Sequence, residues 1–455
     1  MAVSRLADSL PILHRPTLNF EFLHRELSAS ILCFGLLASD QPDFHEIGCS
    51  LLHRLREDII LFTHNNTITM EQVWVLQAML ILEFGGMFYA NRKAMELSDI
   101  FHGTMVTLAR RLGIFEPSYE PARPSSSLSH DTRWLEWIHK ESLKRLAYFI
   151  FVLDVKHALL FGHDRSIFSF SVFAIKLDLP CDNREWGAVG AHEWNAVIPS
   201  LVSGRLKCHE IHNTLLFSQE PDVDLPYLDA LGAYIVFAGL SSITMDFLQR
   251  HHEPFFDRDK AIRRLCHALS AIHERLSSTP ESKVKDHAQM IYYVSLISLY
   301  TPLDDLERAA NSGYSLTGLT PKQQTRSAIV RLLTRNKVEV KSARHATCLL
   351  RIYIPEDLRI SSPYESSGLY LATLTLWAYL TGKGYDHESP MLPSNNTDIE
   401  ALNAMEISLE DSDMAACGKH WRTLVQHVAD RLGKKYNENA REYSQVLHSL
   451  IDITI

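Results

Sequence analysis

Four polar side chains on or just after one apolar stretch are the residues best suited to chemistry in this chain. Tyr148, Asp154 and His157 interrupt a run of hydrophobic residues, and His163 follows where that run ends. A phenol, a carboxylate and two imidazoles can hold or move a proton beside a hydrophobic substrate. A cyclisation that needs mainly shape would leave no sequence motif, because preorganisation alone lowers a barrier by several kcal/mol. These four are therefore the candidate catalytic residues if the chain is an enzyme.

Established catalytic and cofactor motifs are missing from the sequence. It contains no G-x-G-x-x-G, P-loop, G-x-S-x-G or H-E-x-x-H pattern. His209 and His212 are three residues apart and could share a helix face, but no third ligand accompanies them and zinc needs three or four. A solvated helix face is the preferred interpretation of this pair, and we expect no metal and no cofactor.

Cysteine spacing and net charge argue against a built-in DNA reader. No two of the seven cysteines form a C-x-x-C pair, so neither a zinc module nor a disulfide framework is expected. Lys and Arg number 45 against 54 Asp and Glu, a net charge of -9. Because duplex affinity comes largely from basic side chains, direct nucleic-acid binding by this chain is not expected.

Three uncharged runs raise the question of a membrane. Residues 230–245, 287–303 and 366–382 lack Asp, Glu, Lys and Arg, but they are short and contain Gly, Ser or Thr. A spanning helix needs roughly 20 predominantly apolar residues. We therefore expect buried core helices and no membrane association.

Helix signals dominate the chain. Asp43 with Glu46, and Thr69 with Gln72, have the spacing of capping boxes, and Asn91 is a candidate N-cap. The helix after Asn91 is expected to end at Gly113, in the left-handed conformation. Residues 116–130 are expected to form a loop, followed by a helix over 131–157 whose stretch 146–153 is buried. Further helices are predicted near 226–251, 257–277, 285–301, 323–353, 364–382, 411–432 and 437–451, with loops at 302–322 and 384–398.

The predicted fold class is therefore all-α, a large multi-helix domain of two packed helical halves. The halves are expected to join near residues 186–206. The predicted regions are 1–205 and 206–455.

Several segments in the first half resemble one family. Residues 11–18, Pro-Ile-Leu-His-Arg-Pro-Thr-Leu, resemble the opening motif of the fungal-specific transcription factor domain, the middle homology region. Residues 97–115 resemble its next helix. The most specific match is 134–146, Trp-Leu-Glu-Trp-Ile-His-Lys-Glu-Ser-Leu-Lys-Arg-Leu, which continues through Asp154. Leu179-Pro180-Cys181, Trp186 and Trp194 complete the pattern. The resemblance covers roughly residues 8–200.

The resemblance implies a nuclear regulator in which this region controls transcription through a protein partner, a homodimer or a small apolar effector. Family members carry a zinc module before this region, and the pattern here begins near Met1. The first hypothesis is therefore a transcription regulator without its own DNA-binding module. The second is a family scaffold that binds or converts a hydrophobic metabolite in the cytoplasm. The third is a truncated gene product or a dominant-negative regulator.

Four residues in the matched helix are the candidate ligand contacts. They are Trp134, Trp137, Arg145 and Asp154. For Asp154 a structural ion-pair network is preferred to a ligand contact, because a buried carboxylate must be paired or protonated. For the tryptophans, packing in the core or a groove is preferred to binding.

Overall fold

The computed structural model describes residues 2–39, 41–117, 129–161, 171–197, 207–218, 225, 227–249, 257–310, 340–354, 364–382, 414–435 and 438–451. The chain divides into two compact units. The first comprises Met1–Ala158 and His163–Ala288, and the second comprises Leu159–Gly162 and Gln289–Ile455. The predicted division at residue 205 stays a prediction.

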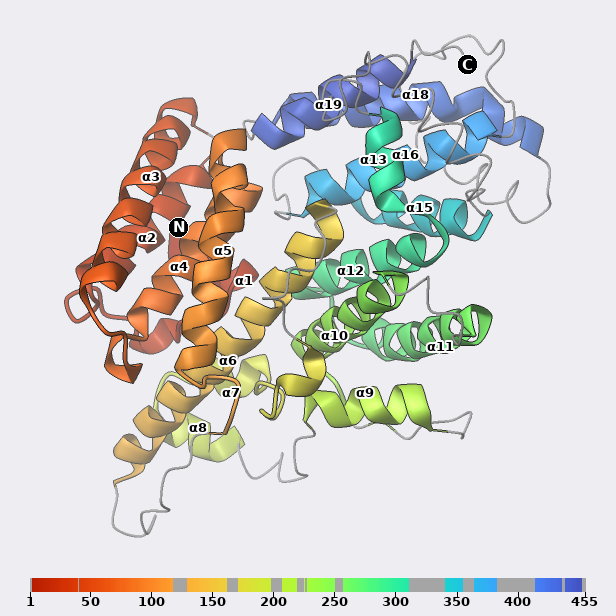
Figure 1. Cartoon of the computed structure of the whole chain (residues 1–455). Helices are drawn as coiled ribbons and strands as arrows, with labels where there is room; N and C mark the ends of the chain where they lie inside the picture. The colour runs from red at the N-terminus through yellow and green to blue at the C-terminus, as the bar shows by residue number, and fades with distance from the viewer. Residues whose placement is uncertain are drawn as a thin grey trace. The chain divides into compact units, whose positions relative to one another are not determined.

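The described residues form α-helices and short 3-10 turns, which confirms the all-α prediction (Figure 1). Their only β-type pairing is an isolated bridge between Asp178 and Lys207. In chain order the helices are α1 (Ala2–Ser9), α2 (Arg25–Leu37), α3 (Pro42–Asn65), α4 (Trp74–Phe88), α5 (Arg92–Arg111), α6 (His130–Phe161), α7 (Asn183–Trp186), α8 (Ala191–Val197), α9 (Cys208–Phe217), α10 (Ala230–Gln249), α11 (Arg258–Ser277), α12 (Lys283–Tyr300), α13 (Leu303–Ala310), α15 (Val340–Tyr353), α16 (Glu365–Gly382), α18 (Met414–Gly433) and α19 (Glu438–Ile451).

In the first unit α4 is the central helix of the N-terminal group. It packs against α2, α3 and α5, and it is almost entirely buried, as its near-continuous apolar sequence requires. Figure 1 shows these helices side by side, in red and orange. Further along the chain, α10 packs on α9 and α11.

Helix ends follow local chemistry at most predicted positions. Asn91 caps α5 by accepting from the backbone N–H of Ala94 at 2.9 Å, and Gly113 has a φ of 66°. The Gln72 side chain accepts from the backbone N–H of Thr69 at 2.9 Å, as the capping box predicts. The predicted box at Asp43 is wrong, because α3 begins at Pro42 and its N-cap is Gln41, two residues before Asp43. Proline favours the first helical turn, where its missing N–H costs nothing.

The predicted helices agree with the structure where residues are described, and the loops agree less well. Of the helix predicted near 323–353, Val340–Tyr353 forms α15, and residues 323–339 lie outside the described residues. Helix α6 spans the expected region, and Leu146–Leu153 is buried throughout. The predicted loop at 302–322 is wrong in its first part, since Leu303–Ala310 forms α13. Pro302 lies between the end of α12 at Tyr300 and the start of α13 at Leu303, so it separates two helices instead of opening a long loop. The predicted loop at 384–398 and most of the loop at 116–130 lie outside the described residues.

In the second unit α16 is the buried helix around which the others pack. It contacts α13, α15, α18 and α19, and α18 packs along α19. Among the described helices, Ala230–Leu248 of α10 is the one long and apolar enough to cross a membrane, and 72% of it is buried inside the protein. Such burial is typical of a core helix.

Candidate functional site

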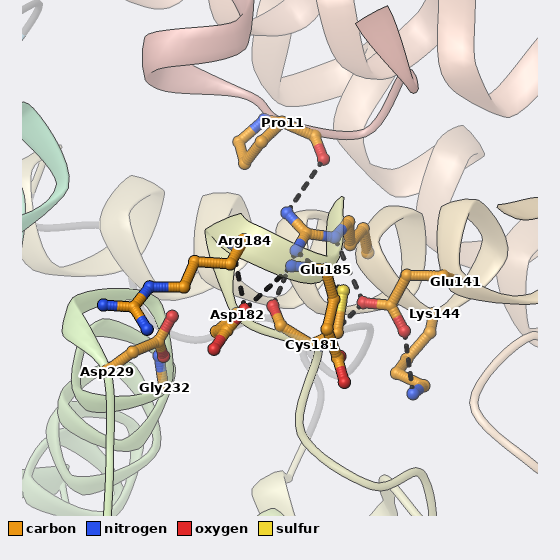
Figure 2. Close-up of polar contacts among 10 residues, drawn as sticks. Pro11, Glu141, Lys144, Cys181, Asp182, Arg184, Glu185, Asp229 and Gly232 are labelled. Carbon is orange, nitrogen blue, oxygen red and sulfur yellow. Dashed lines mark hydrogen bonds and ion pairs between the residues drawn. The ribbon is translucent and has the colours of Figure 1, made fainter. Parts of the chain in front are cut away.

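Three of the segments that carry the family resemblance, at 11–18, 134–146 and 179–181, meet around Arg145. Figure 2 labels three of the residues that lie around it, Pro11, Glu141 and Cys181. The Arg145 guanidinium is fully buried on α6 and bonds in three directions. Its Nε donates to Glu141 Oε1 at 3.1 Å, one terminal nitrogen to the Pro11 carbonyl at 3.4 Å, and the other to the Cys181 carbonyl at 2.7 Å. Because two of these acceptors, the carbonyls of Pro11 and Cys181, come from distant segments, Arg145 joins the N-terminal segment and the segment at Cys181 to α6.

Glu141 completes this buried cluster. Its Oε1 also accepts from the backbone N–H of Cys181 at 2.7 Å, and its Oε2 accepts from Lys144 at 2.9 Å. Burial tends to raise the pKa of Glu141, but the charges of Lys144 and Arg145 and the N–H of Cys181 outweigh it and lower the pKa. Glu141 is therefore held as a carboxylate. We call Pro11, Glu141, Lys144, Arg145 and Cys181 the arginine node.

Tryptophans cover one side of the arginine node. The Arg145 guanidinium carbon lies 4.4 Å from the centroid of the Trp186 ring, a cation–π distance. His14 contacts the edges of Trp134 and Trp186, with ring centroids 5.9 and 4.9 Å away. Burial lowers the pKa of His14 to about 4, so the imidazole is neutral at pH 7.

The predicted core role of the tryptophans is confirmed for Trp134, Trp186 and Trp194. They pack with Ile138, Cys181 and two alanines, while Trp137 is half-buried against them. The indole nitrogens of Trp134 and Trp194 are buried and have no hydrogen-bond partner among the described residues. Indole N–H groups usually find a partner when buried, so these two donors are the unusual feature of the cluster.

Asp154 belongs to a second buried network, which confirms the predicted ion pairing. Its Oδ1 lies 2.8 Å from Nε2 of His102, whose Nδ1 lies 2.6 Å from Glu83 Oε1. Burial tends to lower the pKa of His102, but the charge of Glu83 and the hydrogen bonds with Asp154 and Glu83 outweigh it and raise the pKa to about 10. An imidazolium therefore lies between two carboxylates and joins α4, α5 and α6.

Of the other candidate catalytic residues, one lies beside this network and one contacts a different segment. His157 stacks on His102 with ring centroids 5.3 Å apart. The Tyr148 hydroxyl donates to the Leu177 carbonyl at 2.8 Å, and burial raises the pKa of this phenol well above its usual value. His163 lies outside the described residues.

The histidine pair of α9 makes protein contacts. His212 is fully buried, so the predicted solvated face is wrong for this residue. Its ring nitrogens lie 2.6 Å from the Cys208 carbonyl and 3.0 Å from the Val236 carbonyl. Gly239 makes room for this ring, because a Cβ there would collide with it. Within the described part of the chain, no group of three His, Cys, Asp or Glu residues is arranged to hold a metal ion.

Sequence reasoning missed two members of the second network. Glu83 is the single charged residue in the apolar helix α4, and such a residue signals a buried partner. His102 lay within the family pattern, but nothing in the local sequence showed that it would face Glu83 and Asp154, 19 and 52 residues away.

The fold and its two buried polar networks define an all-helical domain held together by ion pairs among distant segments. The model of the fungal-specific transcription factor domain matches residues 3–278, a segment that contains both networks. This chain therefore belongs to the fungal-specific transcription factor domain family, a class of transcription regulators.

Named relatives agree with this assignment. The chain is 26% identical over 442 residues to the nicotinate catabolism cluster-specific transcription factor of Emericella nidulans, covering 88% of this chain and 50% of the relative. It is 25% identical over 419 residues to zinc finger protein klf1 of Schizosaccharomyces pombe, covering 87% and 52%. The chain thus spans about half the length of these relatives. No solved structure shows significant similarity to it.

Proposed function

We propose that this chain is the regulatory region of a nuclear transcription regulator, and that it controls transcription by binding a protein partner or a small apolar effector. The observation that carries the proposal is the family match over residues 3–278, which contains the arginine node. In this proposal the arginine node holds the helices of the first unit in one arrangement. A partner or effector that binds elsewhere on the unit acts by changing that arrangement.

In this proposal the regulatory region does not itself bind DNA. Residues outside that region, or a heteromeric partner, bind it instead. The excess of acidic over basic residues, 54 against 45, supports this division, because counterion release from DNA requires clustered Lys and Arg. The name of the Schizosaccharomyces pombe relative includes a zinc finger, and that relative is about twice as long as the region this chain matches.

The proposed effector site is the tryptophan cluster, formed by Trp134, Trp186 and Trp194 with Trp137 packed against them. The buried N–H groups of Trp134 and Trp194 could donate to a carbonyl or carboxylate oxygen, and the half-buried Trp137 offers a ring at the edge of the cluster. A small planar molecule with an acceptor oxygen fits this set of groups.

A reporter experiment tests the proposal. The chain is fused to a heterologous DNA-binding domain in a fungal host, and reporter expression and nuclear fluorescence are measured. We expect the fusion to change expression relative to the DNA-binding domain alone, and Glu141→Gln to remove that change. An inert, cytoplasmic fusion that is stably folded would contradict the proposal.

The effector site has its own test. Trp194→Phe keeps a ring but removes the indole N–H, so it should weaken the response to an effector while the fold is kept. Trp421→Phe in the second unit is the matched control, since it changes a buried indole far from the cluster in sequence. Equal effects of both substitutions would count against an effector site at the tryptophan cluster.

A further inference from the structure

One face of α3 carries side chains at the spacing of a coiled coil, although the first unit does not use them in its core. The spacing alternates between three and four residues over three heptads. The residues of this α3 stripe are Phe44, Ile47, Leu51, Arg54, Asp58 and Leu61.

Most of the stripe is exposed to solvent in the single chain, and Leu51 and Asp58 are half-buried. Phe44 is 50% exposed, Ile47 54% and Leu61 59%. The core of the unit uses a different face of α3, which presents Leu52, Leu55 and Ile59. Three large apolar side chains on the unused face of one helix are more than the scattered exposure usual for a monomer.

Helix α2 packs against α3 and carries a further exposed leucine. A Cβ at Gly48 of α3 would lie 2.9 Å from the backbone nitrogen of Leu37 and 3.1 Å from the Cβ of Leu36, so the two helices approach closely there. Leu32, one turn before Leu36 on α2, is 57% exposed. Figure 1 shows α2 and α3 side by side in the N-terminal group.

Opposite charges lie in the middle of the stripe. Arg54 Nε is 3.3 Å from Asp58 Oδ1 on the same helix, and the Arg54 side chain is 71% exposed. In an antiparallel pair of α3 helices related by a two-fold axis between these residues, Arg54 of each copy faces Asp58 of the other. The same register places Leu51 of each copy against Leu61 of the other, because both pairs are equidistant from the axis.

We propose that α3 pairs antiparallel with α3 of a second copy of this chain, with Arg54 opposite Asp58 and Leu51 opposite Leu61. The charge pattern selects this occupant, since the central part of the stripe, from Leu51 to Leu61, is complementary to itself in that register, while Ile47 lies opposite Asn65 of the second copy. A parallel pair would instead set Arg54 against Arg54 and Asp58 against Asp58, and like charges in contact are unfavourable. The inference does not rest on the proposed function, because it uses none of the residues of the arginine node or the tryptophan cluster.

Solution mass tests the dimer. One chain has a mass of 51.9 kDa, and light scattering on the 455-residue protein should approach twice that value. The measurement extends to roughly 100 μM, because a small interface gives a micromolar dissociation constant. A monomeric mass over the whole range would overturn the proposal.

Charge reversal tests the register. Arg54→Asp and Asp58→Arg should each raise the dissociation constant by at least about tenfold, because each places like charges across the axis. An equimolar mixture of the two variants should recover a heterodimer, in which every Arg54 or Asp58 position meets the opposite charge. A mixture that stays monomeric, or single variants that dimerise as the unaltered protein does, would refute this register.

Two apolar variants complete the test. Leu61→Glu should abolish the dimer, and Leu135→Glu is the matched control, because Leu135 is also an exposed leucine, 52% exposed, on helix α6. Circular dichroism checks that both variants remain folded. Loss of the dimer in Leu135→Glu but not in Leu61→Glu would place the interface elsewhere and refute the proposal.

Discussion

The backbone N–H of Cys181 donates to Glu141 at 2.7 Å, through the same carboxylate oxygen that accepts from Arg145 at 3.1 Å. One atom therefore connects α6 both to its own next turn and to a segment 40 residues away. The carboxylate and the guanidinium are almost completely inaccessible to water. In such an arrangement each charge depends on the other, because a buried unpaired charge is costly.

Glu141→Gln should destabilise the first unit by about 3–5 kcal/mol, since it keeps the size of the side chain but leaves the Arg145 charge without its counter-charge. Urea unfolding followed by circular dichroism measures this change. Lys144→Gln is the control: Lys144 contacts the other oxygen of Glu141 and is partly exposed, so its loss should cost less than about 1 kcal/mol. Equal losses for both variants would show that the arginine node does not act through the buried pair.

The pKa of His102 predicts a loss of stability at alkaline pH. Because its pKa is about 10 in the folded chain and 6.5 in the reference state, its contribution is complete below pH 6.5 and is lost as pH rises to about 10. His102→Gln removes the titrating group, so its unfolding free energy should fall less between pH 7 and pH 10 than that of the unaltered protein.

The pH profiles of the unaltered protein and of His102→Gln must be compared, because the titration of a second buried group, Lys156, changes stability in the opposite direction as pH rises. Burial places the pKa of Lys156 well below its usual value, so its contribution to stability increases as pH rises. Lys156 is present in both proteins, and the difference between their pH profiles therefore isolates His102. Parallel profiles would contradict the ion pairing of His102 with Glu83 and Asp154.

Alanine substitution should change stability in opposite directions at two glycines whose surroundings are similarly open. A Cβ at either Gly103 or Gly113 would meet no atom within 4 Å, so neither substitution creates a clash. Gly113 has a φ of 66°, a conformation that costs an L-residue about 1–2 kcal/mol. Gly103 lies inside α5, where alanine is favoured by roughly 0.5–1 kcal/mol. Thermal unfolding of Gly113→Ala and Gly103→Ala should therefore show a lower and a higher midpoint than the parent, and a shift of the same sign would contradict this assignment.

Local signals predicted the helices well because their causes lie within a few residues. The cap at Asn91, the left-handed Gly113 and the all-round apolar stretch Leu146–Leu153 each follow from neighbouring residues. The Asp43 box failed because proline at position 42 competes for the helix start, a local effect that a pattern search overlooked.

The candidate site was harder to predict, because its partners are distant in sequence. The spacing of Glu141 and Arg145 indicated a helical pair, but an exposed pair has the same spacing as this buried one. Only the fold shows that Pro11 and Cys181 close around them. Asp154 was expected in an ion pair, but its partner is one of 23 histidines, and nothing local distinguishes His102 from the others.

The second unit has an ion pair that resembles the arginine node. Arg431 on α18 donates to Glu365 Oε1 through two nitrogens, at 3.0 and 2.7 Å, and to the Ile354 carbonyl at 2.9 Å. Lys435 lies 3.0 Å from the other oxygen of Glu365. Arg431 therefore connects α18 to the start of α16 and to the end of α15.

Arg431→Met should destabilise the second unit by about 3 kcal/mol, since Lys435 still pairs with Glu365 but the Ile354 carbonyl loses its buried donor. Hydrogen exchange locates the effect: protection should fall for amides of α16 and α18, while amides of α4 and α5 in the first unit keep theirs. Arg431→Lys should destabilise the second unit less than Arg431→Met does, but it should still be less stable than the unaltered protein. An ammonium restores the positive charge but not the planar set of donors of the guanidinium. Uniform loss of protection across both units would show that they unfold together and would contradict an effect confined to the second.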